Sequence, residues 1–257
     1  MLGASTTHND IANHDVIRQA YSALADASGT VGSQQIRNVA TVGGNICNAA
    51  PSADTTCPLL IFDARVLIKG KKATREMPLD DFIAGPNKVV LEPGELVTGF
   101  AMPSFGKLTG SVYIKFARRQ AMDLPILGLA TRTTISITGS ETRCKEAFRK
   151  RDDISQTLKV LEEEGLVFKD VRIAMCVMAP RPIRAKKAEE ILKGKTISSK
   201  ILQQVAETVE SESQPRDSFR GEAWYRRHMV KVLTNRALIQ SIYRALVPED
   251  RQFLNWA

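Results

Sequence analysis

The stretch IRNVATVGGNICNAAPSADTTCP, residues 36–58, decides the fold because it is long, poor in charge and rich in residues that shape loops. Gly43 and Gly44 allow positive φ angles and let a ligand approach bare backbone, where successive N–H groups can form a concave anion site. The alternative for a glycine pair is two turns around a buried strand. Short neutral donors, which suit a phosphate or a sugar hydroxyl, recur along the same stretch: Thr41, Asn45, Asn48, Ser52, Thr55 and Thr56.

The charge of the chain does not by itself indicate a nucleic-acid partner. The 257 residues carry a formal net charge of +8, and the sequence pI is about 9.4. The basic residues are scattered, and the densest clusters, at 69–72 and 184–187, are short and lack interleaved aromatic residues. Solvated faces explain them better than a nucleic-acid surface does. The length allows one large or two modest domains.

Cysteine spacing and hydropathy exclude further classes. The four cysteines, Cys47, Cys57, Cys144 and Cys176, form neither a CxxC pair nor a cluster at metal-ligand spacing, so no metal site and a reduced, cytoplasmic protein are expected. The N-terminus has no basic start followed by an apolar core, and no segment reaches about 18 uninterrupted apolar residues. Secretion and a membrane span are therefore not expected.

The apolar pattern predicts an α/β first half and a second half in which strands are followed by helices. A helix is expected over residues 16–27, behind a cap at Thr7 or Asn9. The charge-rich segment 143–164 is interpreted as a surface excursion. Strand formers dominate the segments 64–68, 111–117, 130–137 and 171–179, and within 91–103 a turn at Pro93-Gly94 is followed by a strand that Pro103 stops. Helices are expected at 185–192, 198–211 and 221–246.

Five segments carry a family resemblance: IRNVATVGGNICNAAPSADTT, GELVTGFAMP, YIKFARRQAMDLPILGLA, VRIAMCVMAPRPIRAKKAE and SFRGEAWYRRHMVKVL. In this order, and over nearly the whole chain, they resemble the medium FAD-binding subunit of the molybdenum hydroxylases, the family of xanthine dehydrogenase and carbon monoxide dehydrogenase. The resemblance implies an α+β fold. A FAD-binding α/β subdomain of the PCMH (vanillyl-alcohol-oxidase-like) type would occupy residues 1–107, and a C-terminal domain of a three-stranded antiparallel sheet with a three-helix bundle would occupy 108–257.

The resemblance also implies a set of flavin contacts. Lys115 alone reads as an ordinary strand lysine, but the family places a lysine here beside the isoalloxazine edge, where its charge stabilises the reduced flavin. Asp123 is either a turn residue before Pro125 or an acidic residue facing the ring. The expected cofactor-binding residues are Ala40, Thr41, Val42, Gly43, Gly44, Asn45, Ser52, Asp54, Val97, Lys115 and Asp123.

In such a family member the chain passes electrons from iron–sulfur clusters through FAD to NAD or another acceptor. The implied partners are a molybdopterin-binding large subunit, where substrate is oxidised, and a small subunit with two-iron–two-sulfur clusters. No catalytic proton-transfer residue is expected, and His8, His14 and His228 are interpreted as surface or packing residues. The alternative is a structural or assembly subunit that holds no FAD.

The resemblance has two departures. Family members carry about 80 to 100 further residues, a separate subdomain in size, before the position of Met1, and LGASTTHNDI matches the end of that region. A separate chain supplying that subdomain, a recorded start that is too late, and lost or weakened FAD binding are the three explanations. The second departure is the insertion at 143–164, whose single cysteine, Cys144, is too few for an additional iron–sulfur cluster.

Overall fold

The computed structural model describes residues 1–150 and 153–250. Its first part contains a four-stranded antiparallel sheet in the order β1-β6-β2-β3 and a small two-stranded sheet, β4-β5. The predicted strand at 64–68 and the predicted strand between the turn at Pro93-Gly94 and Pro103 are confirmed. The strands of this part are β1 (Leu2–Gly3), β2 (Arg65–Lys69), β3 (Thr74–Pro78), β4 (Ile83–Gly85), β5 (Lys88–Val89) and β6 (Leu96–Ala101).

Short helices make up the rest of the first part. Thr7 caps the first helix by accepting a hydrogen bond from the Asp10 N–H (3.2 Å), as one of the two predicted caps. The single helix expected over 16–27 is wrong, because the chain breaks at Tyr21, whose ring packs on Phe62 and whose hydroxyl donates to the Pro103 carbonyl (2.9 Å). The helices are α1 (His8–Asn13), α2 (Asp15–Ala20), α3 (Ser22–Gly29), α4 (Gln34–Val39), α5 (Val42–Asn48), α6 (Thr56–Ile61) and α7 (Leu79–Phe82).

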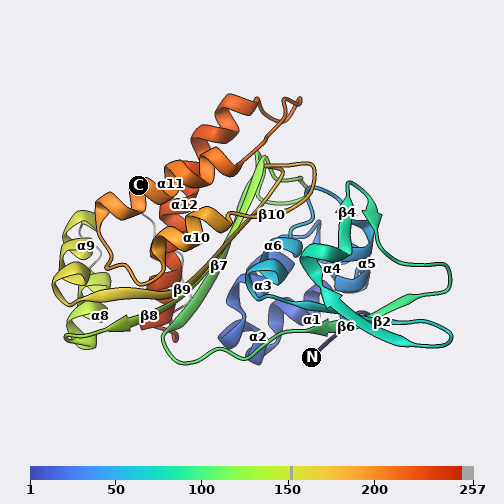
Figure 1. Cartoon of the computed structure of the whole chain (residues 1–257), viewed down its shortest axis with the longest axis horizontal. Helices are drawn as coiled ribbons and strands as arrows, with labels where there is room; N and C mark the ends of the chain where they lie inside the picture. The colour runs from blue at the N-terminus through green and yellow to red at the C-terminus, as the bar shows by residue number, and fades with distance from the viewer. Residues whose placement is uncertain (151–152, 251–257) are drawn as a thin grey trace.

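A long antiparallel sheet in the order β10-β9-β8-β7 organises the second part. It has one strand more than the three expected, because the two residues of β10 pair with the edge of β9. Helices cover it on both faces, so the central strand β8 is buried along most of its length. Figure 1 shows α10, α11 and α12 on one side of this sheet and α3 and α6 of the first part on the other. The strands are β7 (Thr109–Phe116), β8 (Leu127–Ile137), β9 (Leu166–Cys176) and β10 (Ile183–Arg184).

The insertion after β8 is more than a surface excursion. It forms two helices, α8 (Glu141–Lys150) and α9 (Ile154–Glu163), and residues 151–152 between them lie outside the described residues. Apolar residues at helical spacing, Cys144 and Phe148 on α8 and Leu158 and Leu161 on α9, join the core of the second part. The expectation failed because the high charge of the segment sits on the opposite faces of both helices.

The three predicted C-terminal helices are confirmed as α10 (Lys186–Leu192), α11 (Ser199–Glu212) and α12 (Ala223–Leu246). Helix α12 crosses β7 and β8, and its second half is buried almost all round. Within the described ranges, no helix combines the length and the apolar character that crossing a membrane requires.

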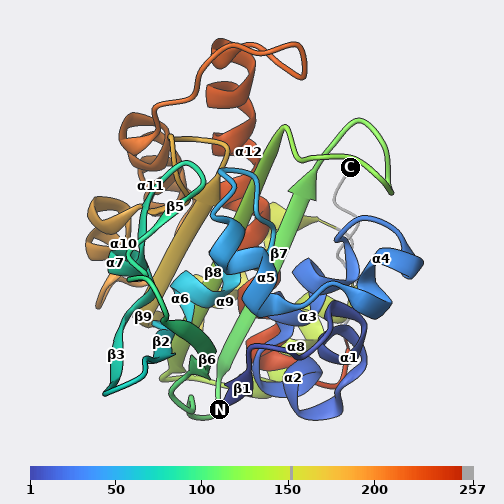
Figure 2. The ribbon, with the colours of Figure 1, turned by 90° about the vertical axis from the view of Figure 1, so that its right-hand side faces the viewer.

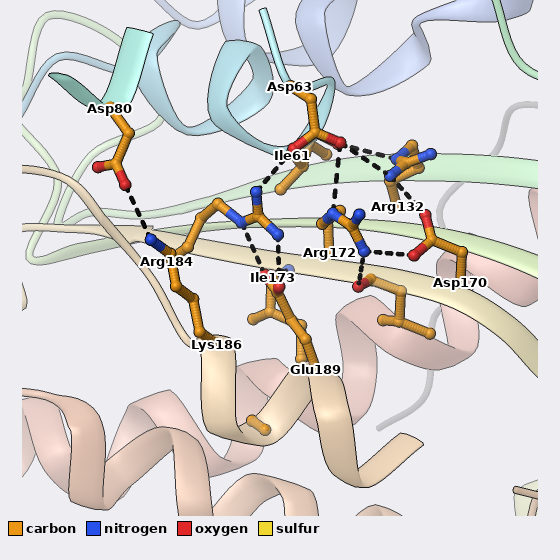
Figure 3. Close-up of polar contacts among 12 residues, drawn as sticks. Ile61, Asp63, Asp80, Arg132, Asp170, Arg172, Ile173, Arg184, Lys186 and Glu189 are labelled. Atoms are coloured by element: carbon orange, nitrogen blue, oxygen red, sulfur yellow. Dashed lines mark hydrogen bonds and ion pairs between the residues drawn. The ribbon is translucent and has the colours of Figure 1, made fainter. Parts of the chain in front are cut away.

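An ion-pair cluster joins the two parts of the chain (Figure 3). Asp63, which follows α6 with a φ of 50°, accepts hydrogen bonds from Arg184 (2.6 Å), Arg172 (3.3 Å) and Arg132 (3.4 Å) of the second sheet. Arg132 is only 3% exposed, and it also donates to Asp170 (2.7 Å). The first part is therefore fixed to the long sheet by charged groups as well as by apolar packing.

Candidate functional site

Helix α5 begins inside the stretch that opened the sequence analysis. Thr41 is its N-cap, and its Oγ1 accepts from the Gly44 N–H (3.1 Å). The Val42 and Gly43 N–H groups donate to the carbonyls of Thr6 (3.1 Å) and Ala4 (2.8 Å). These N–H groups are thus used within the protein, and the expected nest of free backbone donors is wrong. The expected alternative of a buried strand is wrong too, because the segment forms a capped helix.

The two glycines have different roles, and neither has a positive φ. A Cβ on Gly43 would lie 2.7 Å from the Ala4 carbonyl oxygen, so this position requires glycine for close packing against the N-terminal segment. Gly44 is exposed, and a Cβ there would meet only Thr41 Oγ1, at 3.3 Å. Gly44 therefore offers the bare backbone surface that the sequence suggested, in a helical conformation.

A hydrogen bond ties this helix to the segment around Asp54. The Thr55 hydroxyl donates to Asn45 Oδ1 (2.6 Å), which places residues 51–55 against the start of α5. Helix α6 follows directly and is completely buried. Some of the neutral polar side chains of the stretch thus form hydrogen bonds with one another.

Asp54 is the centre of a buried polar cluster. Its carboxylate accepts from the Tyr113 hydroxyl (2.6 Å) and from Lys115 Nζ (2.9 Å), and the side chains of Asp54 and Lys115 are 8% and 9% exposed. Burial raises the pKa of Asp54, against the opposing effects of the Lys115 charge and the hydrogen bonds from Tyr113 and Lys115. Lys115 Nζ also donates to the Thr30 carbonyl (3.0 Å). Within the described residues, these bonds use two of its three donors.

Sequence reasoning missed Tyr113 and its surroundings. Tyr113 and Lys115 are two residues apart on β7, so they share a face of the strand, and this alternation could have pointed to Tyr113. The Tyr113 hydroxyl also lies 3.9 Å from Cys176 Sγ, and burial raises the pKa of both Tyr113 and Cys57 well above their usual values. The cluster therefore combines one ion pair with groups that stay neutral.

Asp123 lies on the loop that joins β7 and β8. Its Oδ1 accepts from the Leu124 N–H (2.9 Å), and Arg119 Nε lies 3.9 Å from its Oδ2. Oδ2 is buried and has no hydrogen-bond partner. Met122 in the same loop has a φ of 55° and donates its N–H to the Gly32 carbonyl (3.3 Å), beside the Thr30 contact of Lys115. This geometry agrees with both interpretations of Asp123, as a turn residue and as an acidic residue whose free acceptor faces a ligand.

The structure brings only some of the predicted residues together. Asn45, Asp54 and Lys115 are joined through the contacts given above, and within the part of the chain that is described this network does not extend to Val97 or Asp123. Val97 is half-buried on β6, opposite Ile68, and packs on the core of the first part. Ala40 precedes the cap of α5, and Ser52 lines a separate cavity.

These residues fit a flavin nucleotide on structural grounds. The Gly44 face is open, Asp123 Oδ2 is an acceptor without a hydrogen-bond partner among the described residues, and Lys115 lies at the end of a buried network. Figure 2 shows α5 in front of the long sheet that contains β7, with the loop between β7 and β8 at the upper right of the view. Such a set offers positioning and electrostatics, which is what a protein supplies to a redox cofactor.

Sequence comparison assigns both parts of the chain. Residues 1–105 match the family described as the FAD binding domain in molybdopterin dehydrogenase, and residues 112–241 match the CO dehydrogenase flavoprotein C-terminal domain. A xanthine dehydrogenase FAD-binding subunit of Escherichia coli O157:H7 is 31% identical over 245 residues, which cover 95% of this chain and 74% of that protein. The glyceraldehyde dehydrogenase medium chain of Sulfolobus acidocaldarius is 29% identical over 92% of this chain and 73% of its own length.

Solved structures agree with these sequence matches. A carbon monoxide dehydrogenase of Hydrogenophaga pseudoflava contains a chain that superposes with a TM-score of 0.77 at 25% identity, over 94% of this chain and 74% of that one. The fold is thus the FAD-binding PCMH-type domain followed by the C-terminal flavoprotein domain. The chain belongs to the FAD-binding medium subunits of the molybdenum hydroxylase family.

Proposed function

We propose that this chain is the electron-transfer subunit of a cytoplasmic molybdenum hydroxylase complex, in which electrons pass from iron–sulfur clusters through FAD to NAD or another acceptor. Its partners would be a molybdopterin-binding large subunit and a small subunit with two-iron–two-sulfur clusters. The flavin domain would span residues 1–107 and the C-terminal domain 108–257. The observation that carries the proposal is the buried Asp54–Lys115 pair, linked through Thr55 to Asn45 beside the open face of Gly44.

The residues of the chain have distinct parts in this proposal. Bound FAD would supply the redox chemistry. Thr41 fixes the start of α5 and so the direction in which Gly44 faces. Asp54 and the Thr30 carbonyl hold the Lys115 ammonium in place. These two hydrogen bonds fix the direction in which its third N–H group would point toward the flavin. The other proposed contacts are Ala40, Val42, Gly43, Asn45, Ser52, Val97 and Asp123.

The experiment substitutes Gly44→Leu in the chain purified with its natural partners. A leucine covers the bare backbone at an exposed position, where its Cβ would meet only Thr41 Oγ1, at 3.3 Å, and leucine favours a helix over glycine by about 0.8 kcal/mol. We expect the flavin released per complex to fall at least tenfold. Substrate should still reduce the iron–sulfur clusters, seen by electron paramagnetic resonance, while reduction of the acceptor is lost.

The matched control is Gly106→Leu, at an exposed glycine with no atom within 4 Å of a built Cβ. This complex should keep its flavin. If Gly44→Leu loses its flavin and still reduces the acceptor at the full rate, the electron path runs elsewhere. If wild-type chain carries no flavin in an active complex, the structural-subunit alternative replaces the proposal.

A further inference from the structure

A cavity of about 390 Å³ opens between the two parts of the chain, apart from the Asp54 cluster. Its walls come from residues 51–52, Pro86, the 124–125 end of the β7–β8 loop, residues 177–180 and the 214–226 segment before and within α12. Backbone hydrogen bonds fix these walls to one another: Val177 N–H to the Pro51 carbonyl (3.0 Å) and Gln214 N–H to the Met178 carbonyl (2.6 Å). The cavity is thus a built part of the fold.

Positive charge gathers on one wall of this cavity. Arg216, Arg220 and Arg226 all line it, and the lining residues include no aspartate or glutamate. No salt bridge joins any of these three arginines to a carboxylate within 4.0 Å in the part of the chain that the structure describes. The charges of Arg216 and Arg220 both act against the charge of Arg226, and the nearby Asp217 opposes them.

Two of these guanidinium groups have unused donors. The Nε–H groups of Arg220 and Arg226 are buried and have no hydrogen-bond partner. Arg226 is only 2% exposed, and its Nη2 donates to the Ser218 hydroxyl (2.6 Å). Burial, and then the charge of Arg216, lower the pKa of Arg226, and Asp217 opposes them. Leaving a buried donor without an acceptor destabilises the fold, so these two N–H groups favour a ligand that brings an acceptor.

Aromatic packing holds one of the arginines in place. The Arg220 guanidinium lies 4.3 Å from the centroid of the Phe219 ring, and Arg118 of the β7–β8 loop approaches the same ring at 5.9 Å. A stacked guanidinium loses less freedom when it binds an oxyanion in a bidentate manner.

The remaining wall is mostly apolar. Leu124, Val177 and four prolines face the arginines across the cavity. A volume of about 390 Å³ lies in the range of small-molecule pockets, roughly 300–1,000 Å³. The combination suits a ligand that has an oxyanion at one end and an apolar or planar body at the other.

We propose that this arginine pocket binds the phosphate or carboxylate group of a small organic molecule, with Arg216, Arg220 and Arg226 as the anion ligands and the proline-rich wall holding its apolar body. The inference does not depend on electron transfer by the chain, because the three arginines are not among the proposed flavin contacts, although Ser52 of that set lines the same cavity.

The experiment measures binding of phenyl phosphate, inorganic phosphate and phenol by isothermal titration calorimetry, with the FAD-loaded complex and with the chain alone. We expect phenyl phosphate to bind more tightly than phosphate, and phenol to bind at least tenfold more weakly. Arg216→Gln and Arg220→Gln, at positions that are not fully buried, should each weaken phenyl phosphate binding about 10- to 100-fold, since a charge-assisted hydrogen bond contributes about 1.5–3 kcal/mol.

Arg236→Gln is the matched control, because it removes the same charge from an exposed position of α12 outside the cavity. It should leave binding unchanged. If all three variants weakened phenyl phosphate binding equally, the loss would come from the lower net charge of the protein, and the proposal would be overturned. Binding to the chain alone but not to the FAD-loaded complex would also overturn it, because the cofactor or a partner's acidic side chain then fills the pocket.

Discussion

At the scale of single residues, Gly43 and Gly44 show that adjacent glycines are present for different reasons. Gly43 is required because the Ala4 carbonyl approaches it, whereas Gly44 is exposed and a Cβ there would meet only Thr41 Oγ1, at 3.3 Å. The distinction separates a residue needed for folding from one that we propose lies against the flavin. The free energy of unfolding of variants at the two positions tests this distinction.

We expect Gly43→Ala to lower the free energy of unfolding by about 1–3 kcal/mol, because the new Cβ would lie 2.7 Å from backbone that cannot move freely. Gly44→Ala should change it by less than about 1 kcal/mol, since the helical preference for alanine offsets the contact with Thr41 Oγ1. Urea unfolding of both variants measures the difference. Equal losses would show that Ala4 does not constrain α5.

His8 gives a pH dependence that the sequence could not indicate. It is buried at the start of α1, its Nδ1 has no partner, and burial, followed by the charge of Arg37, lowers its pKa from 6.5 to about 4. Between pH 6.5 and 4 the unfolded chain therefore binds a proton that the folded chain does not. Stability from this group is full above pH 6.5 and is lost as pH falls toward 4.

We expect His8→Asn to flatten this slope, removing up to about 3 kcal/mol of the change in unfolding free energy across the window. Urea unfolding at several pH values between 4 and 7 provides the measurement. His14→Asn, at an exposed histidine nearby, serves as the control and should keep the wild-type slope. An unchanged slope in His8→Asn would mean that His8 titrates alike in both states.

At the scale of elements, the pair α8–α9 shows that a segment with many charged residues can still contribute apolar side chains to the core. Both helices carry many charged residues, yet Phe148 is fully buried and its ring lies 5.3 Å from that of Tyr243 on α12. The pair thus covers the end of the long sheet and supports α12. An insertion that only lay on the surface could be substituted on every face without loss of stability.

We expect Phe148→Ala to destabilise the protein by about 3–5 kcal/mol, the usual cost of deleting a buried aromatic ring. Gln156→Ala, on the exposed side of α9, should stay within about 0.5 kcal/mol of wild type. Both values come from urea unfolding. A small loss for Phe148→Ala would restore the interpretation of 143–164 as a surface excursion.

At the scale of the whole molecule, Asp63 couples the two parts of the chain. Its three arginine partners all belong to the second part, and the buried Arg132 depends on Asp63 and Asp170 for its charge balance. Burial lowers the pKa of Arg132, and the two aspartates oppose that effect. The contact therefore matters more than an exposed ion pair of the same length.

We expect Asp63→Asn to lower the free energy of unfolding by about 1–2 kcal/mol, less than for a fully buried charge because Asp63 is 37% exposed. Asparagine tolerates the positive φ at this position, so backbone strain does not confuse the result. The control is Glu76→Gln, whose pair with Arg65 is exposed on both sides (45% and 51%) and should have almost no effect. Thermal unfolding compares them, and equal shifts would contradict a coupling role.

The sequence by itself determined the family, most strand positions and the three C-terminal helices. Alternating apolar residues at 64–68 and helical spacing at 221–246 are local patterns, and local patterns report which face of an element is buried. The cap at Thr7 belongs to the same class, since its hydrogen bond reaches only three residues along the chain. The matches of whole segments in order added the flavin-subunit fold.

Only the tertiary structure decided how these elements meet. Asp54 and Lys115 are 61 residues apart, and Gly43 needs its bare Cα because strand pairing brings Ala4 against it. The break at Tyr21, the buried charge of Arg132 and the arginine pocket likewise depend on contacts between distant segments. Such contacts follow from packing of the whole chain, in which long-range burial outweighs local preference.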